Sequence, residues 1–251
     1  MDISGNTVLI TGGATGIGYA FAEYFLKTGN EVIICGRREE RLLEAKKKHP
    51  EFQIKVCDVA KEADRNSLVE WATSNFDKLN ILVNNAGVQR DVDFTKGVTE
   101  FLSGENEIRI NLEATIILTG LFIPHLTGKK EASIINVSSG LGFIPVARMP
   151  VYSASKAGVH AFSMAIRQQL IKSGIKVFEV VPPAIESELN PEGRAKRGNF
   201  KIDLKPGEFV DAVMEGIKNN IFEIGYGMTA GLIKASREDL DKSFQQMNSH
   251  W

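Results

Sequence analysis

The feature that most constrains the fold is a repeated alternation of short apolar segments with longer segments of helical periodicity. The short segments are apolar almost throughout, as strands are when helices cover both faces of a parallel sheet. They are TVLIT (7–11), EVIIC (31–35), FQIKVC (52–57), ILVNNA (81–86), SIINVSS (133–139) and IKVFEVV (175–181). Residues 18–30 repeat apolar side chains at intervals of three and four and stop at Gly29, which is typical of a helix. The alternation predicts an α/β fold with a doubly wound parallel sheet and right-handed crossovers.

The bulk properties narrow the class of protein. The chain has 251 residues and a formal net charge of −1, so we expect one α/β domain over residues 1–251. A charge near zero gives no support to nucleic-acid binding. No apolar run reaches the roughly 20 residues that a membrane span needs, and the N-terminus MDISGNTVLI lacks the pattern of a signal peptide. Since the two cysteines, Cys35 and Cys57, make no disulfide framework, we expect buried reduced thiols and a cytoplasmic protein.

A glycine-rich turn, TGGATGIG (11–18), directly follows the first predicted strand and opens the first predicted helix. Gly12, Gly16 and Gly18 would let the backbone turn sharply and approach a pyrophosphate, which the free N–H groups of the helix would bind. No Gly-Lys-Ser/Thr follows, so the turn is not a Walker motif. In this position the turn predicts a dinucleotide site.

The end of the second strand bears on the choice between NAD and NADP. An NAD site places a carboxylate there, about 20 residues after the glycines, to accept a hydrogen bond from the ribose 2′-hydroxyl. Here Gly36 is followed by Arg37 and Arg38, and guanidinium groups suit a 2′-phosphate. We therefore expect NADP(H). Asp58, after the third strand, either contacts the adenine amino group or caps the next helix, and the sequence does not decide between these roles.

Tyr152 and Lys156 stand four residues apart in PVYSASKAGVHAF (150–162), near the start of a predicted helix. Positions i and i+4 share one helix face. A free tyrosine hydroxyl has a pKa of about 10, and bringing it near neutrality takes roughly 4 kcal/mol. An ammonium at about 4 Å in a partly screened site supplies on the order of 4 kcal/mol. The pair is therefore a candidate acid–base group, although an isolated Tyr-x-x-x-Lys is usually an ordinary surface feature.

Six ordered motifs together resemble the short-chain dehydrogenase/reductase family, over essentially the whole chain up to about residue 190. They are TGGATGIG, CDV (57–59), NNAG (84–87), RINLEA (109–114), NVSSG (136–140) and YSASK (152–156). The resemblance implies a Rossmann-type sheet of order 3-2-1-4-5-6-7, NAD(P)-dependent hydride transfer between a carbonyl and an alcohol, and a homodimer or homotetramer. NNAGVQRDVDF, the double proline at 182–183 and FEIGYG (222–227) look like a bacterial branch of DltE-type oxidoreductases, which implies no particular substrate.

The resemblance also implies roles for individual residues. Ser139, thirteen residues before Tyr152, would bind the substrate oxygen, with Ser138 a poorer candidate. Asn111 would disturb its helix and hold a water that links Lys156 to solvent, or else be a buried structural asparagine. Lys156 would also bind the ribose hydroxyls. The residues expected at the cofactor are Gly12, Thr15, Gly16, Ile17, Gly18, Arg37, Arg38, Asp58, Val59, Asn85, Ala86, Gly87, Tyr152, Lys156, Ile185 and Ser187. No metal site is expected.

Some of the sequence departs from the family pattern. Pro182-Pro183 replaces the usual Pro-Gly after the sixth strand, which alters the loop expected over the nicotinamide. The polar, Gly- and Pro-rich residues 186–208 are a candidate substrate lid, and residues 236–248 are a candidate amphipathic C-terminal helix. Phe143, Ile144, Val146 and Met149 could line an apolar substrate pocket, or simply pack the protein interior or a subunit contact.

Three functions fit this pattern. The first is an NADPH-dependent reductase of ketones or aldehydes. The second is a 3-oxoacyl-[acyl-carrier-protein] reductase, in which Lys129, Lys130 and Lys172 would dock the acidic carrier protein. Against this, Phe178 stands where such enzymes usually have asparagine. The third is a regulatory protein that senses NADP without turnover, although the candidate catalytic residues are all present.

Overall fold

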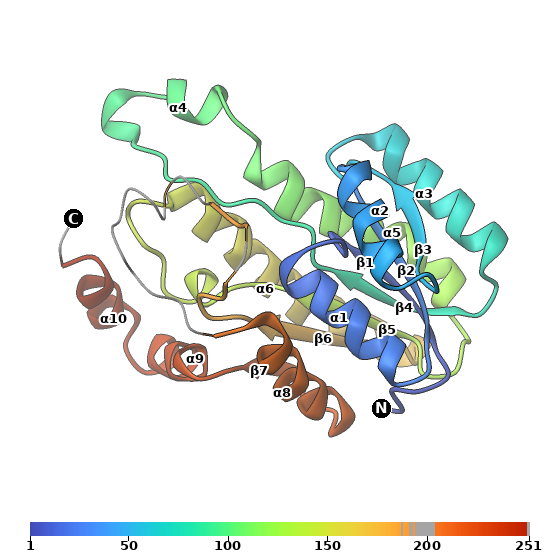
Figure 1. Cartoon of the computed structure of the whole chain (residues 1–251). Helices are drawn as coiled ribbons and strands as arrows, with labels where there is room; N and C mark the ends of the chain where they lie inside the picture. The colour runs from blue at the N-terminus through green and yellow to red at the C-terminus, as the bar shows by residue number, and fades with distance from the viewer. Residues whose placement is uncertain (187, 191–192, 194–203, 250–251) are drawn as a thin grey trace.

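One parallel sheet of seven strands runs through the computed structural model, which describes residues 1–186, 188–190, 193 and 204–249 (Figure 1). The strand order is β3-β2-β1-β4-β5-β6-β7, and every neighbouring pair is parallel. The strands are β1 (Thr7–Thr11), β2 (Glu31–Gly36), β3 (Gln53–Val56), β4 (Leu79–Asn84), β5 (Ser133–Val137), β6 (Lys176–Val181) and β7 (Glu223–Gly225). The predicted fold class and strand order are confirmed.

Helices cover both faces of the sheet, which explains why its strands are apolar throughout. Successive strand residues point to opposite faces, so Val8 and Ile10 pack in one buried cluster while Leu9 packs in the other. The first cluster includes residues of α1 (Gly16–Lys27), α2 (Glu39–Lys48) and α8 (Pro206–Lys218). The second includes residues of α3 (Glu62–Asn75), α5 (Ala114–Leu126) and α6 (Pro150–Leu170).

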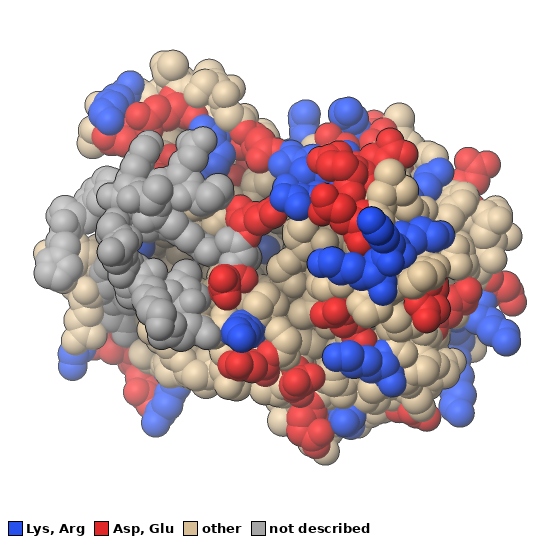
Figure 2. Space-filling model, viewed as in Figure 1, with Lys and Arg blue, Asp and Glu red and all other residues tan. Residues whose placement is uncertain are grey.

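The remaining elements are short or lie toward the C-terminus. The four-residue α4 (Thr99–Leu102) belongs to an arm that projects from the body (Figure 1), and a π-helical segment, Ile108–Glu113, precedes α5. Toward the end of the chain lie α9 (Met228–Glu238) and α10 (Leu240–Met247). Within the described residues, no helix is long and apolar enough to cross a membrane. On the face shown in Figure 2, acidic and basic side chains are interspersed.

The single C-terminal helix expected over residues 236–248 is wrong in its bounds. The helical conformation is interrupted at Asp239, whose backbone is extended (φ −158°, ψ 90°). The Asp239 side chain accepts a 2.9 Å hydrogen bond from the Lys242 N–H. Aspartate is a favoured N-cap residue, so it ends α9 and starts α10. Of the candidate lid, Ser187 and most of residues 191–203 lie outside the described residues.

The site lies at the carboxyl edge of the sheet. Strand order reverses between β1 and β4, and in open α/β sheets ligands bind outside the carboxyl ends of the strands at such a point. Thr11, Asn84 and Val137 end strands there, so the motifs that follow β1, β4 and β5 come together although they are far apart in the sequence.

Candidate active site

The glycine turn is built so that only glycine fits at two of its positions. Gly12 has a φ of +64°, in the left-handed region that glycine favours. A Cβ on Gly18 would lie 2.3 Å from the Gly12 carbonyl oxygen and 2.4 Å from Asn85 Nδ2. Asn85 in turn donates hydrogen bonds to the carbonyls of Thr11 (2.9 Å) and Gly12 (3.2 Å). The turn is thereby fixed against the segment that follows β4, and Gly16 and Ile17 at the N-terminus of α1 line a cavity there.

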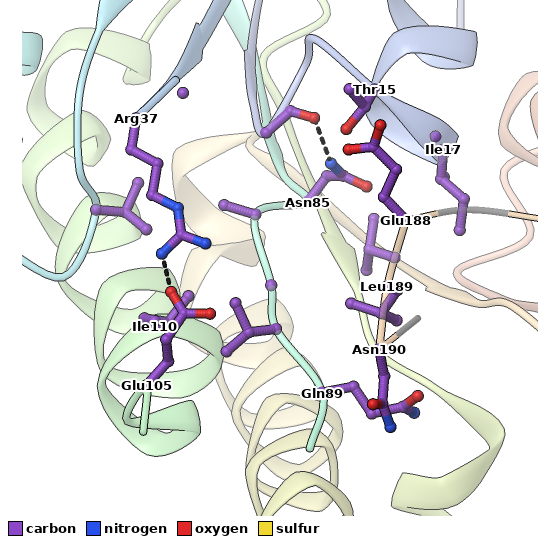
Figure 3. A pocket seen from close by; sticks show the side chains of 18 of the residues that line it. Thr15, Ile17, Arg37, Asn85, Gln89, Glu105, Ile110, Glu188, Leu189 and Asn190 are labelled. Atoms are coloured by element: carbon purple, nitrogen blue, oxygen red, sulfur yellow. Dashed lines mark hydrogen bonds and ion pairs between the residues drawn. The ribbon is translucent and has the colours of Figure 1, made fainter. Parts of the chain in front are cut away.

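A cavity of about 560 Å³ runs along this edge of the sheet (Figure 3). Its lining includes the glycine turn, arginines from the start of α2, and Tyr152 and Lys156 of α6. The residues expected at the cofactor that line it are Gly12, Thr15, Gly16, Ile17, Arg37, Arg38, Asp58, Val59, Asn85, Ala86, Gly87, Tyr152 and Lys156. Close backbone, a helix N-terminus and cationic groups in one cavity fit a dinucleotide.

Lys156 is almost completely buried in this cavity wall. Its Nζ donates a 2.8 Å hydrogen bond to the Val137 carbonyl and lies 5.9 Å from the centre of the Tyr152 ring. Burial lowers the pKa of Lys156 to about 8. Gly87 lies directly beside Lys156, because a Cβ on Gly87 would lie 3.6 Å from Lys156 Nζ and 3.3 Å from Asn111 Oδ1. Lys156 and Asn111 therefore both lie beside Gly87, and Tyr152 lies one helical turn from Lys156.

Asn111 lies in the π-helical segment that leads into α5, where the family resemblance implied a disturbed helix. Its side chain is buried and accepts a 2.8 Å hydrogen bond from the Val88 N–H. Its Nδ2 donates to the Val88 carbonyl at 2.9 Å and to Ser155 Oγ at 3.0 Å. Asn111 thus ties the loop after β4 to α6, and in this arrangement it does not itself line the cavity.

The two serines after β5 are placed differently. Ser139 Oγ accepts a 3.2 Å hydrogen bond from the Leu141 N–H, capping the 3₁₀ turn Gly140–Gly142. Ser138 lines the cavity, and its Oγ lies 3.4 Å from the Val180 carbonyl oxygen that accepts its hydrogen bond. Ser139 is not among the cavity-lining residues. Its position as the cap of this turn fixes its Oγ, and its hydroxyl proton goes to none of the described residues.

The remaining residues predicted for the cofactor site and the substrate pocket are mostly buried away from the cavity. Asp58 lines the cavity but is not the N-cap of α3, which is Lys61; its Oδ1 accepts a 3.0 Å hydrogen bond from the Ala60 N–H. Ile185 is buried in the first core cluster. The four candidate pocket residues are buried in two small clusters, Phe143 and Ile144 in one and Val146 and Met149 with Tyr152 in the other, and none lines the cavity.

Each predicted arginine has an acidic partner that the sequence did not reveal. Arg37 forms an ion pair with Glu105 (Figure 3), and Arg38 Nη1 lies 2.8 Å from Glu188 Oε2. Arg41, which sequence reasoning missed, pairs with Glu188 Oε1 at 2.8 Å. The spacing of Arg38 and Arg41 on one helix face was a usable signal. No pattern in the sequence indicated that Glu188, some 150 residues away, pairs with these arginines.

Comparison with known proteins agrees with this geometry. The sequence model of the short chain dehydrogenase family matches residues 6–198. The chain is 45% identical over 249 residues to the uncharacterized oxidoreductase DltE of Bacillus subtilis (strain 168), covering 99% of each chain. It is 27% identical to a short-chain dehydrogenase from Sphingobium yanoikuyae solved in complex with NADPH, with a TM-score of 0.78 and 98% and 96% of the two chains covered.

A further solved structure extends the likeness in fold. A short chain dehydrogenase/reductase from Burkholderia phymatum, in complex with NAD, has a TM-score of 0.82 at 20% identity, with 96% of each chain covered. The glycine turn after β1, the Tyr152–Lys156 pair of α6 and the match over residues 6–198 all indicate the same family. The chain therefore belongs to the short-chain dehydrogenase/reductase family of oxidoreductases.

Proposed function

We propose that the chain is an NADPH-dependent carbonyl reductase that converts a ketone or aldehyde to an alcohol, reversibly. The observation that carries the proposal is the composition of one cavity. Its lining combines the arginines Arg37, Arg38 and Arg41, the glycine turn, and the buried pair Tyr152 and Lys156. A dinucleotide laid along the turn would have cations for its adenosine end and an acid–base pair for its nicotinamide end.

In this proposal the side chains divide the work of reduction. When bound, the reduced nicotinamide supplies the hydride. Tyr152 donates its hydroxyl proton to the substrate oxygen as that oxygen gains charge. Lys156, one helical turn away, stabilises the tyrosinate that results and binds the ribose hydroxyls. Ser139 donates a hydrogen bond that holds the substrate oxygen, and Asn111 maintains the proton path from Lys156 by fixing the loop at Val88.

The preference for NADP over NAD rests on charge. The two solved relatives hold NADPH and NAD respectively, so they do not decide the matter. Gly36 is followed by arginines rather than by a carboxylate, and Arg37 and Arg38 both line the cavity. Guanidinium groups favour a phosphate over a hydroxyl, which supports NADP(H).

We also infer a homodimer or homotetramer. Ile116 and Leu121 of α5 and Met164 of α6 are 37–50% exposed, which supports burial of these two helices against another copy. Light scattering of the purified protein tests this inference, and a monomeric mass at micromolar concentration contradicts it.

The proposed function is tested by NADPH and NADH oxidation against a panel of ketones, aldehydes and acyl-carrier thioesters, with Tyr152→Phe as the control. We expect turnover of simple carbonyls with NADPH, slower turnover with NADH, and loss of turnover in Tyr152→Phe with NADPH binding retained. Equal rates for the two proteins contradict the acid–base role of Tyr152. Better turnover of thioesters would indicate the acyl-carrier reductase, and NADPH binding without any turnover would indicate a sensor.

A further inference from the structure

A histidine and two glutamates meet at the edge of the sheet that β6 and β7 form. Glu179 of β6 stands directly opposite Glu223 of β7 in the strand register. His160 of α6 packs against both, with its Nδ1 2.8 Å from Glu179 Oε2 and 3.9 Å from Glu223 Oε2. One imidazole nitrogen and two carboxylate oxygens thus lie within 4.8 Å of one another. None of the three residues lines the dinucleotide cavity.

The burial of this cluster leaves one of its oxygens without a partner. The Glu179 side chain is 0% exposed, and its Oε1 has no hydrogen-bond partner among the described residues. The Phe143 ring, whose centre lies 4.2 Å from that of the His160 ring, makes one side of the cluster apolar. A buried carboxylate oxygen without a partner is unfavourable, and two carboxylates that stand opposite each other repel. A cation bound between the two carboxylates relieves both effects.

Two arginines lie close to the cluster. Arg237 Nη2 lies 2.9 Å from Glu223 Oε1 and 2.8 Å from Glu223 Oε2, but its side chain is 58% exposed. Arg167 donates instead to two backbone carbonyls. Within the described residues, neither arginine has a hydrogen bond to Glu179. Because exposed ion pairs are weak, a divalent ion is able to displace the Arg237 guanidinium from Glu223.

We propose that His160, Glu179 and Glu223 bind a divalent transition-metal ion, for which Zn²⁺ is the best match. Zn²⁺ binds imidazole nitrogen together with carboxylate oxygen, whereas Mg²⁺ prefers oxygen ligands. His160 binds the ion through Nδ1, and any proton on that nitrogen passes to solvent. The ion takes the place of Arg237 at Glu223.

The role of this ion is structural, because no step of carbonyl reduction uses it. Its ligands come from α6, β6 and β7, so it ties the helix to the edge of the sheet. His160 follows Lys156 by one helical turn, and the ion therefore holds the part of α6 that carries the proposed acid–base pair. The sequence predicted no metal site, since the three ligand residues lie far apart in the chain and show no ligand spacing.

The test measures metal binding by the full chain without an affinity tag, by calorimetry with Zn²⁺ and by the visible absorption of Co²⁺. We expect one ion per chain at micromolar or tighter affinity, and no comparable binding of Mg²⁺. His160→Gln and Glu223→Gln should each weaken Zn²⁺ binding by at least about tenfold. Arg237→Gln should strengthen it about two- to tenfold, because both Glu223 oxygens become free.

His49→Gln is the matched control. His49 Nε2 lies 3.0 Å from Glu23 Oε1, and His49 belongs to no cluster of three ligand residues in the described part of the chain. His49→Gln should therefore leave Zn²⁺ binding unchanged. Thermal unfolding gives a second readout, because an ion that binds only the folded state stabilises it. Zn²⁺ should raise the unfolding midpoint of the unmodified chain and of His49→Gln, but not of His160→Gln.

Two results would overturn the site. Zn²⁺ binding that is unchanged in both His160→Gln and Glu223→Gln places the ion elsewhere on the chain. An unmodified chain that gives neither a heat of Zn²⁺ binding nor a Co²⁺ spectrum has no such site. If His160→Gln proves to be unfolded by circular dichroism, Glu223→Gln decides the matter, since the Glu223 side chain is partly exposed at 19%.

Discussion

Lys156 Nζ donates a 2.8 Å hydrogen bond to the carbonyl oxygen of Val137, the last residue of β5. This contact fixes the ammonium at the carboxyl edge of the sheet, 5.9 Å from the centre of the Tyr152 ring. The carbonyl partner is neutral, and burial lowers the pKa of Lys156 to about 8. Lys156 is therefore positively charged at neutral pH but loses its proton in a pH range where free lysine does not.

The first prediction concerns the pH dependence of carbonyl reduction. Because the proposed mechanism requires the Lys156 ammonium, kcat/KM with NADPH should be level below about pH 8 and fall by up to tenfold per pH unit above it. Steady-state rates between pH 6 and 10 check this. Lys156→Met should lose most of the activity at every pH. A profile that stays level to pH 10 contradicts the assignment.

The second prediction compares two glycines in helices. Gly18→Ala places a Cβ 2.3 Å from the Gly12 carbonyl oxygen, so the free energy of unfolding should fall by more than about 2 kcal/mol. Dinucleotide binding should be lost with it. Gly120→Ala, in α5, meets no atom within 4 Å and should raise stability by about 0.5–1 kcal/mol. Urea denaturation measures both, and equal stabilities of the two variants contradict the close packing of the turn.

The third prediction concerns His160, whose Nδ1 lies 2.8 Å from Oε2 of the fully buried Glu179. The hydrogen bond to Glu179 raises the pKa of His160, Glu223 also raises it, and Arg237 opposes the shift. Because the pKa is higher in the folded protein, the stabilisation is complete below about pH 6.5 and declines as pH rises through the folded value. His160→Phe keeps the ring that packs on Phe143 and should cost about 1–3 kcal/mol at pH 6.

Two comparisons make the His160 experiment decisive. The deficit of His160→Phe should be smaller at pH 9 than at pH 6, as measured by denaturation at both values. Adding Glu179→Gln to His160→Phe should recover part of the loss, because a neutral amide is less costly to bury than an unpaired carboxylate. A deficit that is independent of pH and unaffected by Glu179→Gln would show that His160 acts only through packing.

The fourth prediction concerns Glu107, which is buried and accepts a 2.9 Å hydrogen bond from the Arg90 N–H through Oε1. Its Oε2 has no partner among the described residues, and burial raises the pKa of Glu107 to about 7. Between about pH 4.5 and 7 the folded state binds more protons than the unfolded state, so stability falls as pH rises through that range. Glu107→Gln should therefore be about 1–3 kcal/mol more stable than the unmodified chain at pH 8.

The exposed Glu105 supplies the control for Glu107. Glu105→Gln should change the free energy of unfolding by less than about 0.5 kcal/mol at any pH. Denaturation of both variants at pH 5 and pH 8 separates burial from charge. If Glu107→Gln shows the same pH dependence as the unmodified chain, the carboxyl of Glu107 does not titrate in this range.

Local sequence patterns were sufficient to predict six of the seven strands and the glycine turn, whereas the strand order came from the family resemblance. Apolar runs such as TVLIT predict buried parallel strands because both of their faces must be covered, and Tyr152 and Lys156 share a helix face because of their spacing. The glycine turn follows β1 directly, and Gly16 and Gly18 belong to the first turn of α1. These features depend on neighbours within one or two turns of the chain.

The partners of the charged groups could not be predicted in this way. Glu188 reaches Arg38 and Arg41, and Glu179 of β6 reaches His160 of α6, through tertiary contacts that have no periodicity in the sequence. The helix boundary at Asp239 was missed because the apolar residues that indicated the helix all follow it, so they did not locate its start, although Asp239 is itself a capping residue. Ion pairs between residues that are far apart in the sequence are the part of this site that could be identified only from the structure.

The central claim is that hydride passes from the nicotinamide to a carbonyl carbon while Tyr152 supplies the proton. The most direct measurement reacts the protein with NADPH deuterated at C4 of the nicotinamide and an accepted ketone, and analyses the alcohol by mass spectrometry. With the stereoisomer that the protein uses, we predict one deuterium on the carbinol carbon and almost no alcohol from Tyr152→Phe. Alcohol that carries no deuterium with either stereoisomer, or that forms equally fast with Tyr152→Phe, contradicts the claim.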